Sequence, residues 1–580
     1  MTRRRACTVI TAQAVWNQLR ELQDSMFGAP LSVVDVGLIY DVAVVGSDVR
    51  VVVTMFNRGH IYINSLSSAV RQSVLALDGV DEVTVECVWD PPWTPDRLSP
   101  AARDVLGFQA GDPIEGRLHI TSELKAPLDA SPPFDERHLD GGPLRVTSVT
   151  QGQVAELDSN RLQRWRGGWK FYNRFEFAEG GGLSRRNEPV HLECSFDAEH
   201  IRDLAREARL VAEDSLEEVP CQVYGEYTEA GLRHCTIAFL ADVEAREQRS
   251  YLLLYGNPSP ACWTPFHSTD LVTRGEGYAL EIENSYYRVR LSPVMGQLRN
   301  LEFKRWGRTC LGNEDPTAIN TTSATNDPEA KLDIAWHGED SCLHWNPDFT
   351  KQLRYRITNW PEPPHFSVAR GPICTVVKRW GYPVCPVFPA LHQTAVTIAV
   401  TYTFYCGLPY FTMESRLDVE EELDIGAVRN DEWVLFGRPF THAMAMGDDG
   451  ALETFLSGEG KPFESNPALV GLFHEAKGDA FVSLGLSYDA RGFPGAYDPK
   501  GRGVGITGAG NQLWVRWAYH PEGEAPVIQP GATIGEHNAY LLYNVGEEGG
   551  HEQARNWYDR LRQPLIATQL NQRGRARVRK

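Results

Sequence analysis

The stretch EIENSYYRVRLSPVMGQLRNLEFKR, residues 281–305, alternates apolar and polar residues on both sides of a turn that contains Gly296. Alternation with a period of two is typical of a β-strand that buries one face. Similar short runs recur between residues 144 and 545, for example YLLLY at 251–255, TAVTIAVTYTFY at 394–405 and LWVRWAY at 513–519, and most are separated by Gly, Pro, Asn or Asp. Many short strands with turn residues between them predict antiparallel sandwiches or barrels.

The chain is too long for one hydrophobic core, because its 580 residues correspond to roughly three to four ordinary domains. We predict a multidomain, mainly β fold, in which a small α/β domain precedes a small β barrel-like domain and a large antiparallel β-sandwich. The predicted parts are residues 1–110 (α/β domain), 111–143 (a linker rich in Pro, Asp and Gly), 144–260 (small β domain), 270–545 (sandwich) and 546–580 (C-terminal helix and basic tail). Within the small β domain, the run AEHIRDLAREARL at 198–210 predicts a helix.

Charge and composition argue against several classes of partner. The formal net charge is −19 and basic residues cluster at the two ends of the chain, so the body of the protein would repel a nucleic acid. No apolar run in the sequence approaches the ~20 residues that span a bilayer, and we therefore predict no membrane partner. The 11 cysteines form no CxxC motif, which favours buried free thiols in a reducing compartment and predicts a cytoplasmic protein.

Residues 1–110 show the order helix, strand, strand, helix, strand, in runs at 12–26, 37–45, 49–56, 65–77 and 82–89. The segments VVDVGLIYDVAV (33–44), LDGV (77–80) and VWDPPWTPDRLSPAARDVLGF (88–108) resemble the MIP18/PaaD-like family. The resemblance covers under a fifth of the chain. It implies an α/β fold and a role in iron–sulfur cluster assembly or in the maturation of metalloenzymes.

This unit departs from the family at the position of the reactive cysteine. Members of the family usually carry Cys-Pro shortly after the second strand, whereas residues 54–60 read TMFNRGH. A thiolate is the obvious ligand for iron–sulfur chemistry, and Cys87 lies inside the third predicted strand, where a buried small side chain is its expected role. We therefore expect a docking or dimerisation module without the transfer function.

The large β region carries a second resemblance. In residues 281–305 an Asn precedes a strand that ends in a Gly turn, and the next strand returns with Leu298, Leu301 and basic residues. The stretch TYTFYCGLPYFTMESRLDV at 401–419 shows a strand, a Gly-Leu-Pro turn and an outgoing strand. Both are similar to the galactose-mutarotase-like β-sandwich of many polysaccharide lyases and of the C-terminal parts of some α-mannosidases. The resemblance implies carbohydrate processing, although the site and not the fold decides function.

The densest polar and aromatic segment is IAWHGEDSCLHWNPDFTKQLRYRITNWPEPPHF at 334–366. A sugar site needs flat aromatic faces and a few polar groups, and elimination from a uronate needs a base and a group that neutralises the carboxylate. The candidate catalytic residues here are His337, His344 and Tyr355, and the candidate substrate-binding residues are Trp336, Trp345, Asn346, Lys351 and Trp360. The alternative is a long exposed loop whose histidines only make hydrogen bonds.

A second segment, 428–445, adds Arg429 as a carboxylate neutraliser and His442 as an acid or base. Alternatively, Arg429 pairs with a neighbouring carboxylate to hold a turn, and His442 is a hydrogen-bonded core residue. His337 and His344 with Glu339 or Asp340 could hold a divalent metal ion as a cofactor, although their spacing matches no short metal-binding motif.

We therefore predict a carbohydrate-active enzyme, a lyase or a glycoside-cleaving enzyme that acts on small oligosaccharides or glycosides. Histidine and tyrosine would supply acid–base chemistry, and arginine would neutralise charge. The alternative, from a different class, is a non-catalytic assembly or docking subunit of a metalloenzyme complex. In that case the N-terminal domain would bind a partner enzyme or a second copy of the chain.

Overall fold

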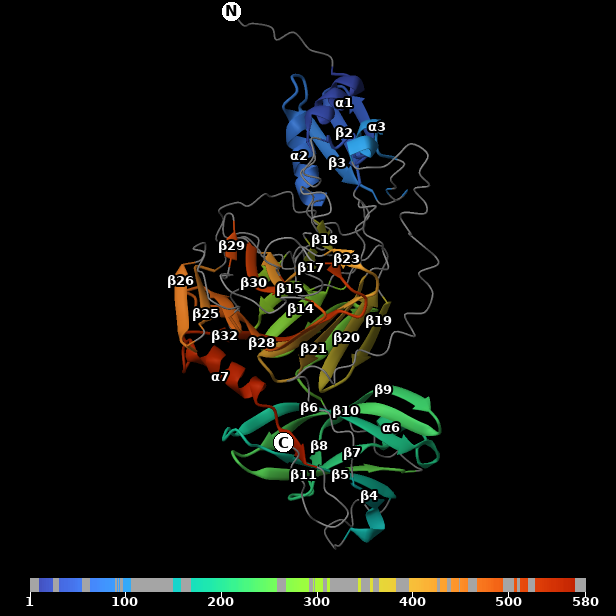
Figure 1. Ribbon diagram of the computed structural model, residues 1–580, viewed down its shortest axis with the longest axis vertical. Coiled ribbons are helices and arrows are strands. Elements are labelled where there is room, and N and C mark those ends of the chain that lie inside the picture. Colours follow the sequence, from blue (N-terminus) through green and yellow to red (C-terminus); the bar gives the residue numbers. More distant parts are fainter. Residues whose placement is uncertain are drawn as a thin grey trace, which may run out of the picture.

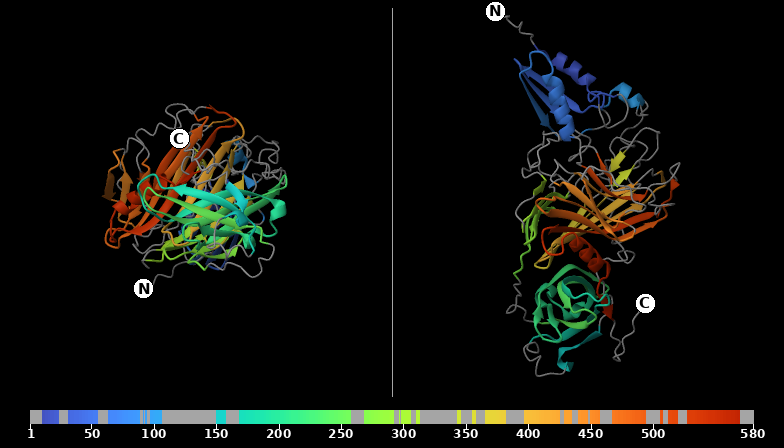
Figure 2. Two further views of the ribbon diagram at one scale, coloured as in Figure 1. Left: turned by 90° about the horizontal axis from the view of Figure 1, so that it is seen from below. Right: turned by 90° about the vertical axis from the view of Figure 1, so that its left-hand side faces the viewer.

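The computed structural model is mainly β, as the sequence predicts, with seven sheets among the residues that it describes. Figures 1 and 2 show an α/β domain, a large β-sandwich and a small β body. None of the described helices is long and apolar enough to cross a membrane. The described residues are 10–23, 31–54, 63–88, 91, 93, 97–105, 150–157, 168–257, 268–291, 296, 298–305, 310–312, 343–345, 355–357, 365–381, 396–424, 428–434, 440–447, 449–456, 467–493, 505–507, 512–519 and 527–568.

The N-terminal domain has a three-stranded sheet in the order β1-β2-β3, with β1 antiparallel and β3 parallel to the central β2. A parallel pair needs a crossover connection, and α2 lies in that connection. The first helix begins at its Thr11 cap and ends at Glu21, earlier than the apolar spacing predicts, because Leu22 is extended. The elements are α1 (Ala12–Glu21), β1 (Ile39–Val45), β2 (Asp48–Val53), α2 (Ile63–Leu75), β3 (Glu82–Cys87) and α3 (Pro100–Val105).

The small β body contains a three-stranded sheet, β6-β10-β9, and a second sheet in the order β33-β5-β11-β7-β8, to which β4 adds. Their apolar faces share one core, which includes Phe177, Leu192, Phe239 and Leu253. The strands are β4 (Thr150–Gln153), β5 (Phe171–Ala178), β6 (Arg185–Asp197), β7 (Arg209–Ala212), β8 (Glu218–Val219), β9 (Cys221–Glu229), β10 (Leu232–Val243), β11 (Gln248–Tyr255) and β33 (Ile566–Thr568).

The helix predicted at residues 198–210 is wrong. The segment forms a 3-10 turn, Ala198–His200, a single helical turn, α6 (Leu204–Glu207), and then strand β7. Asp197 and Asp203 each cap one of the two turns through their carboxylates. Pairing of β7 with β11 then takes the last two residues of the run, Arg209 and Leu210, into the sheet, so tertiary pairing overrides the helical pattern.

The sandwich is built on a nine-stranded antiparallel sheet, the large sheet, in the order β19-β20-β21-β22-β32-β28-β27-β25-β26. A five-stranded sheet, the cover sheet β12-β13-β14-β15-β16, shares one hydrophobic core with it. The strands of the large sheet are β19 (His365–Arg370), β20 (Cys374–Gly381), β21 (Val396–Tyr405), β22 (Tyr410–Val419), β25 (His442–Met446), β26 (Leu452–Leu456), β27 (Leu469–Phe473), β28 (Asp479–Arg491) and β32 (Thr533–Asn544). Those of the cover sheet are β12 (Val272–Glu276), β13 (Ala279–Glu283), β14 (Tyr287–Leu291), β15 (Leu298–Phe303) and β16 (Cys310–Gly312).

The Asn that precedes the strand in the stretch 281–305 ties the two sheets together. Asn284 is fully buried, and its Oδ1 accepts from the backbone of Tyr286 and Tyr287 at 2.8 and 3.0 Å. Its Nδ2 donates to the carbonyl oxygens of Tyr405 and Leu408, both at 2.9 Å. One side chain thus sets the entry to β14 and holds the turn between β21 and β22.

A third sheet of this region, the His344 sheet, has the order β18-β17-β24-β30-β29, and a two-stranded ribbon joins β23 to β31. Figure 1 shows β17, β18, β29 and β30 at the end of the sandwich away from the small β body. The strands are β17 (Leu343–Trp345), β18 (Tyr355–Ile357), β23 (Leu423–Asp424), β24 (Val428–Val434), β29 (Gly505–Thr507), β30 (Gln512–Tyr519) and β31 (Val527–Ile528).

The C-terminal segment joins the sandwich to the small β body. The helix α7 (Glu552–Arg562) places Trp557 against Tyr410 of the large sheet, with ring centroids 5.2 Å apart. The chain then continues into β33, which pairs with β5 so that Ile566 lies opposite Ala178. The small β body is therefore completed by a strand from the far end of the sequence.

Buried polar groups fix the same junction. Arg185 is 1% exposed, pairs with Glu179 at 3.3 Å, and donates to the Arg560 carbonyl at 2.7 Å. His191 lies between two tyrosines, with Nδ1 2.8 Å from the Tyr224 hydroxyl and Nε2 3.0 Å from the Tyr405 hydroxyl. These buried contacts join the small β body to the C-terminal segment and to the large sheet, and they hold the two β bodies in one arrangement.

Candidate functional site

Most of the predicted loop site falls outside the described residues. Trp336, His337, Glu339, Asp340, Asn346, Lys351 and Trp360 lie there, and their roles stay predictions. His344, Trp345, Tyr355 and Arg429 lie on strands whose backbone alone is described.

The backbone register brings two of the predicted catalytic residues together. In the His344 sheet, His344 is the Cα partner of Arg356 on one side and of Arg429 on the other, and Arg429 is in turn the partner of Trp517. The neighbouring row contains Tyr355, Trp345, Val428 and Tyr519. Directly opposed residues of an antiparallel pair have Cβ atoms roughly 4.5–5.5 Å apart, so these positions are immediate neighbours.

His442 lies elsewhere, at the start of β25 in the large sheet. Its ring stacks on Phe473 with centroids 5.2 Å apart. Its Nδ1 lies 2.9 Å from the Thr441 hydroxyl, and its Nε2 is 3.8 Å from the Glu475 carboxylate. His344 and His442 are therefore on different sheets, and the register does not join them into one row.

Sequence reasoning missed two polar rows that cross one face of the large sheet, which we call the polar face. The first row consists of consecutive Cα partners on five strands: Lys378, Thr401, Glu414, His537 and Ser487. The second lies two residues along each strand and contains His365, Trp380, Ala399, Arg416, Gly535 and Asp489. Because side chains two residues apart share a face, both rows belong to the same surface of the sheet.

At the centre of the polar face, a carboxylate and an imidazole occupy directly opposed positions of two paired strands. Glu414 is 8% exposed and its partner His537 is 4% exposed, so both side chains are almost withdrawn from water. Met413 and Leu417 alternate with Glu414 and Arg416 along β22, so their side chains lie on the opposite face of the sheet. They belong to the core that the large sheet shares with the cover sheet. A carboxylate and an imidazole in neighbouring positions can take one proton and donate another.

An aromatic group lies on the same face, two strands along the sheet from Glu414. Trp380 is half-buried, its ring stacks on His365 with centroids 5.8 Å apart, and the Lys378 ammonium lies 5.6 Å from the ring centroid. One strand, β21, lies between Lys378 and Glu414, so the two residues are two strand spacings apart, or roughly 10 Å at about 4.8 Å per spacing. A flat ring, a cation and an acid–base pair are thus available over a span comparable with one or two sugar rings.

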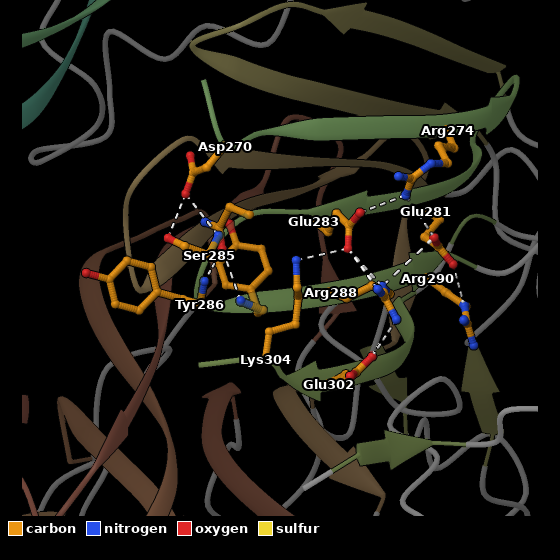
Figure 3. A network of polar contacts seen from close by, with 12 residues as sticks. Asp270, Arg274, Glu281, Glu283, Ser285, Tyr286, Arg288, Arg290, Glu302 and Lys304 are labelled. Carbon is orange, nitrogen blue, oxygen red and sulfur yellow. Dashed lines mark hydrogen bonds and ion pairs between the residues drawn. The ribbon is translucent and has the colours of Figure 1, made fainter. Parts of the chain in front are cut away.

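The cover sheet carries a different polar cluster, shown in Figure 3, whose charges neutralise one another. Glu283 accepts from Arg274 at 2.8 Å, Arg288 at 3.0 Å and Lys304 at 3.0 Å. Burial opposes ionisation of Glu283, but the hydrogen bonds from Arg274, Lys304 and Arg288 outweigh it and lower its pKa to about 2. Each carboxylate and each cation labelled there already has a protein partner, so we assign the cluster to stability.

In the N-terminal domain, the parallel strands β2 and β3 end side by side at the position where the family carries its cysteine. Thr54 is 1% exposed and donates to the Val88 carbonyl at 2.8 Å. The Arg97 guanidinium lies 3.7 Å from the centroid of the Tyr40 ring. Burial raises the pKa of the Cys87 thiol to about 12, so this cysteine stays protonated near neutral pH.

Metal-binding side chains do not gather in the described part of the chain. No group of three His, Cys, Asp or Glu residues there could hold a metal ion. The metal site predicted from His337, His344, Glu339 and Asp340 involves residues or side chains outside that part and stays a prediction.

Comparison with known proteins supports the first resemblance at the level of sequence. Residues 12–86 match the family described as "Iron-sulfur cluster assembly protein". The chain is also similar to the Fe-S protein maturation auxiliary factor YitW of Bacillus subtilis, with 28% identity over 96 residues, which are 16% of this chain and 92% of that protein. The family match lies within the N-terminal domain.

The remainder of the chain is similar in fold to carbohydrate-active enzymes. An alpha-mannosidase from Enterococcus faecalis V583 covers 68% of this chain with 10% identity and a TM-score of 0.40, and the chain spans 46% of its length. Galactose 1-epimerase from Lactobacillus acidophilus NCFM covers 48% of the chain with 10% identity and a TM-score of 0.29, over 99% of its own length. These likenesses concern the fold, and they do not assign a reaction.

Proposed function

We propose that the sandwich cleaves carbohydrate by acid–base catalysis. This activity is separate from that of the N-terminal domain, in which residues 12–86 match the iron–sulfur cluster assembly protein family. The observation that carries the proposal is the pairing of Glu414 with His537 at the centre of the polar face. Both groups are almost fully buried, yet they lie on the face turned away from the core that the large sheet shares with the cover sheet.

The residues of the polar face suit the steps of sugar cleavage. In this proposal the Glu414 carboxylate takes a proton from the substrate or from water, and the His537 imidazole gives a proton to the leaving oxygen. The Trp380 ring offers a flat surface to the apolar side of a pyranose ring. Thr401 and Lys378 complete the row with a hydroxyl and a cation that can bind sugar oxygens.

The His344 sheet supports the finer proposal that the substrate is an acidic sugar. Arg356 and Arg429 are the Cα partners of His344 on its two sides, and arginine is the residue type best suited to bind a uronate carboxylate. We propose elimination with Arg429 as the neutralising group, and His344, His337 and Tyr355 as further proton-transfer residues. His442 contacts Thr441 and lies near Glu475, and we retain it as an acid–base candidate.

Product analysis tests the reaction type. Small oligosaccharides with and without uronates are incubated with the protein, and the near-ultraviolet absorbance of an unsaturated uronate is followed together with new reducing ends. Absorbance that is lost in Arg429→Ala supports elimination, whereas reducing ends without absorbance identify hydrolysis. Release of neither product from any of these substrates would refute carbohydrate cleavage.

A second function is favoured for the N-terminal domain by its family and its chemistry. Residues 54–60 contain no cysteine, and the nearby Cys87 has a pKa raised to about 12 by burial. We propose that this domain docks the chain onto a metalloenzyme or onto a second copy, and that it does not transfer a cluster.

Two experiments test this second function. Light scattering of the full chain and of a variant without residues 1–110 tests self-association. Iron analysis after incubation with ferrous iron and sulfide tests cluster binding. A stoichiometric cluster would refute this assignment.

We also propose a cytoplasmic location. Six cysteines of the described part of the chain are free thiols, and a reducing compartment keeps thiols in that state. Thiol counting on protein isolated from its own cells under alkylating conditions tests the proposal, because a secreted protein would carry oxidised cysteines.

A further inference from the structure

The small β body carries an aromatic platform on one face of its three-stranded sheet, β6-β10-β9. Tyr227, His234 and Ser195 are consecutive Cα partners across the three strands. The Tyr227 and His234 rings stack with centroids 4.7 Å apart and planes 17° apart, and the Ser195 hydroxyl lies 2.8 Å from His234 Nδ1. Tyr227 is nevertheless 58% exposed, so the imidazole supports one face of the ring and solvent covers the other.

A β-bulge directs Tyr227 to this face. The register between β9 and β10 shifts so that Tyr227 pairs with His234 while Tyr224 pairs with Thr236. Gly225 lies in the shift with φ +65°, in the left-handed region that favours glycine. Tyr224 and Tyr227 are three residues apart and would face opposite sides of a regular strand, whereas the bulge puts both on one side.

The platform lies on the same sheet face as the residues that join the small β body to the sandwich. Tyr224 lies at the buried end of this face, where it contacts the junction with the sandwich through His191. Figure 1 shows β9 and β10 side by side at one edge of the small β body, next to the sandwich. The face thus runs from the junction outward to Tyr227, and its inner end is fixed by the contacts of the two β bodies.

The charged side chains around the platform indicate what kind of ligand it can bind. Glu193, Asp197 and Glu229 are exposed near it, and Arg233 is engaged with Glu226 at 3.7 Å. Carboxylates accept hydrogen bonds from hydroxyl groups and repel anionic polymers. A supported aromatic ring stacks on the apolar side of a sugar ring at a low cost in conformational entropy.

We infer that this face is a binding site for a neutral, hydroxyl-rich glycan chain, with one sugar ring stacked on Tyr227. The site binds and does not cleave, and it is separate from the polar face of the large sheet. The inference therefore goes beyond the proposed cleavage and holds whether or not that reaction occurs.

Affinity electrophoresis of the full chain tests the site, in gels that contain soluble glucan, mannan or xylan and, separately, polygalacturonate. At least one neutral polysaccharide should retard the wild type, and Tyr227→Ala should raise the dissociation constant about tenfold or more, as expected for loss of an aromatic anchor. Tyr227→Trp should retain binding, which separates loss of the ring from loss of the fold. Phe366→Ala, which removes a 45% exposed aromatic from the sandwich, should bind as the wild type does.

Three results would overturn the inference: no retardation by any neutral polysaccharide, unchanged binding by Tyr227→Ala, or retardation by polygalacturonate alone. Turnover of small glycosides should be the same in Tyr227→Ala and the wild type. Failure of cleavage and failure of glycan binding are therefore seen in different assays.

Discussion

Replacement of Glu283 by Gln probes the cover sheet where its charge network is densest. Glu283 lies at the end of β13 with its side chain 10% exposed, and three cations surround it: Arg274, Arg288 and Lys304. The Glu283→Gln variant keeps the shape of the side chain but removes the negative charge that neutralises these cations. The cover sheet then contains uncompensated positive charge against the sandwich core, and the protein should lose stability.

The size of the loss follows from the pKa of the carboxyl group. Hydrogen bonds from the three cations lower the pKa of Glu283 from 4.5 to about 2 against the opposing effect of burial. At 1.36 kcal/mol per unit this corresponds to roughly 3 kcal/mol, which solvent screening at the exposed arginines reduces to about 1–2 kcal/mol. Because the folded-state pKa is below the unfolded value, the stabilisation is complete above about pH 5 and is lost as the pH falls toward 2.

Urea unfolding followed by tryptophan fluorescence at pH 7 and pH 3 measures this difference. The gap between wild type and Glu283→Gln should be about 1–2 kcal/mol at pH 7 and clearly smaller at pH 3. Glu302→Gln is the matched control, because among the described residues Glu302 pairs with one cation, Arg288, and its side chain is 37% exposed. This variant should cost below about 0.5 kcal/mol. Equal losses in the two variants, or a gap that does not change with pH, would refute the reasoning.

Three further predictions concern other parts of the molecule. Arg185→Met breaks a buried ion pair and the contact with the C-terminal segment, so urea unfolding should show a loss of about 3–5 kcal/mol, whereas the exposed Arg186→Met should cost below about 0.5 kcal/mol. Equal effects would contradict this difference in burial. Gly37 has φ +74°, and Gly37→Ala would place a methyl group 2.5 Å from the Arg97 carbonyl oxygen. The free energy of unfolding of the N-terminal domain should therefore fall by more than about 1 kcal/mol. An unchanged melting curve would contradict this clash. Burial raises the pKa of the Cys87 thiol to about 12, so Cys87 should react with iodoacetamide at pH 7.5 at least about 100-fold more slowly than free cysteine. Peptide mapping measures the rate of labelling, and rapid labelling would contradict the assigned burial.

The strands could be predicted because their signal is local. In residues 281–305, apolar residues recur at every second position, and the structure places Ile282, Val289 and Leu301 in the core as that pattern requires. The run at 198–210 has a helical pattern as well, but its last residues pair with β11 and form β7. That pairing depends on residues distant in the sequence, so the local pattern gave the wrong element.

The candidate site could be predicted only in part for the same reason. The residue types in the loop at 334–366 indicated His344, and a separate segment indicated Arg429, but their pairing depends on the register of β17 and β24. Glu414 and His537 each lie in an alternating strand where a polar residue on the outer face is unremarkable. Their importance arises only when β22 and β32 pair, because this makes the two residues direct neighbours.

The central claim is that carbohydrate is cleaved on the polar face of the large sheet. The most direct measurement is the kcat of His537→Ala relative to the wild type on a small glycoside that the wild type cleaves, at concentrations of folded protein matched by near-ultraviolet circular dichroism. Loss of a group that transfers a proton in the transition state should lower kcat about 100-fold or more. A variant that folds like the wild type and turns over at the same rate would contradict the account.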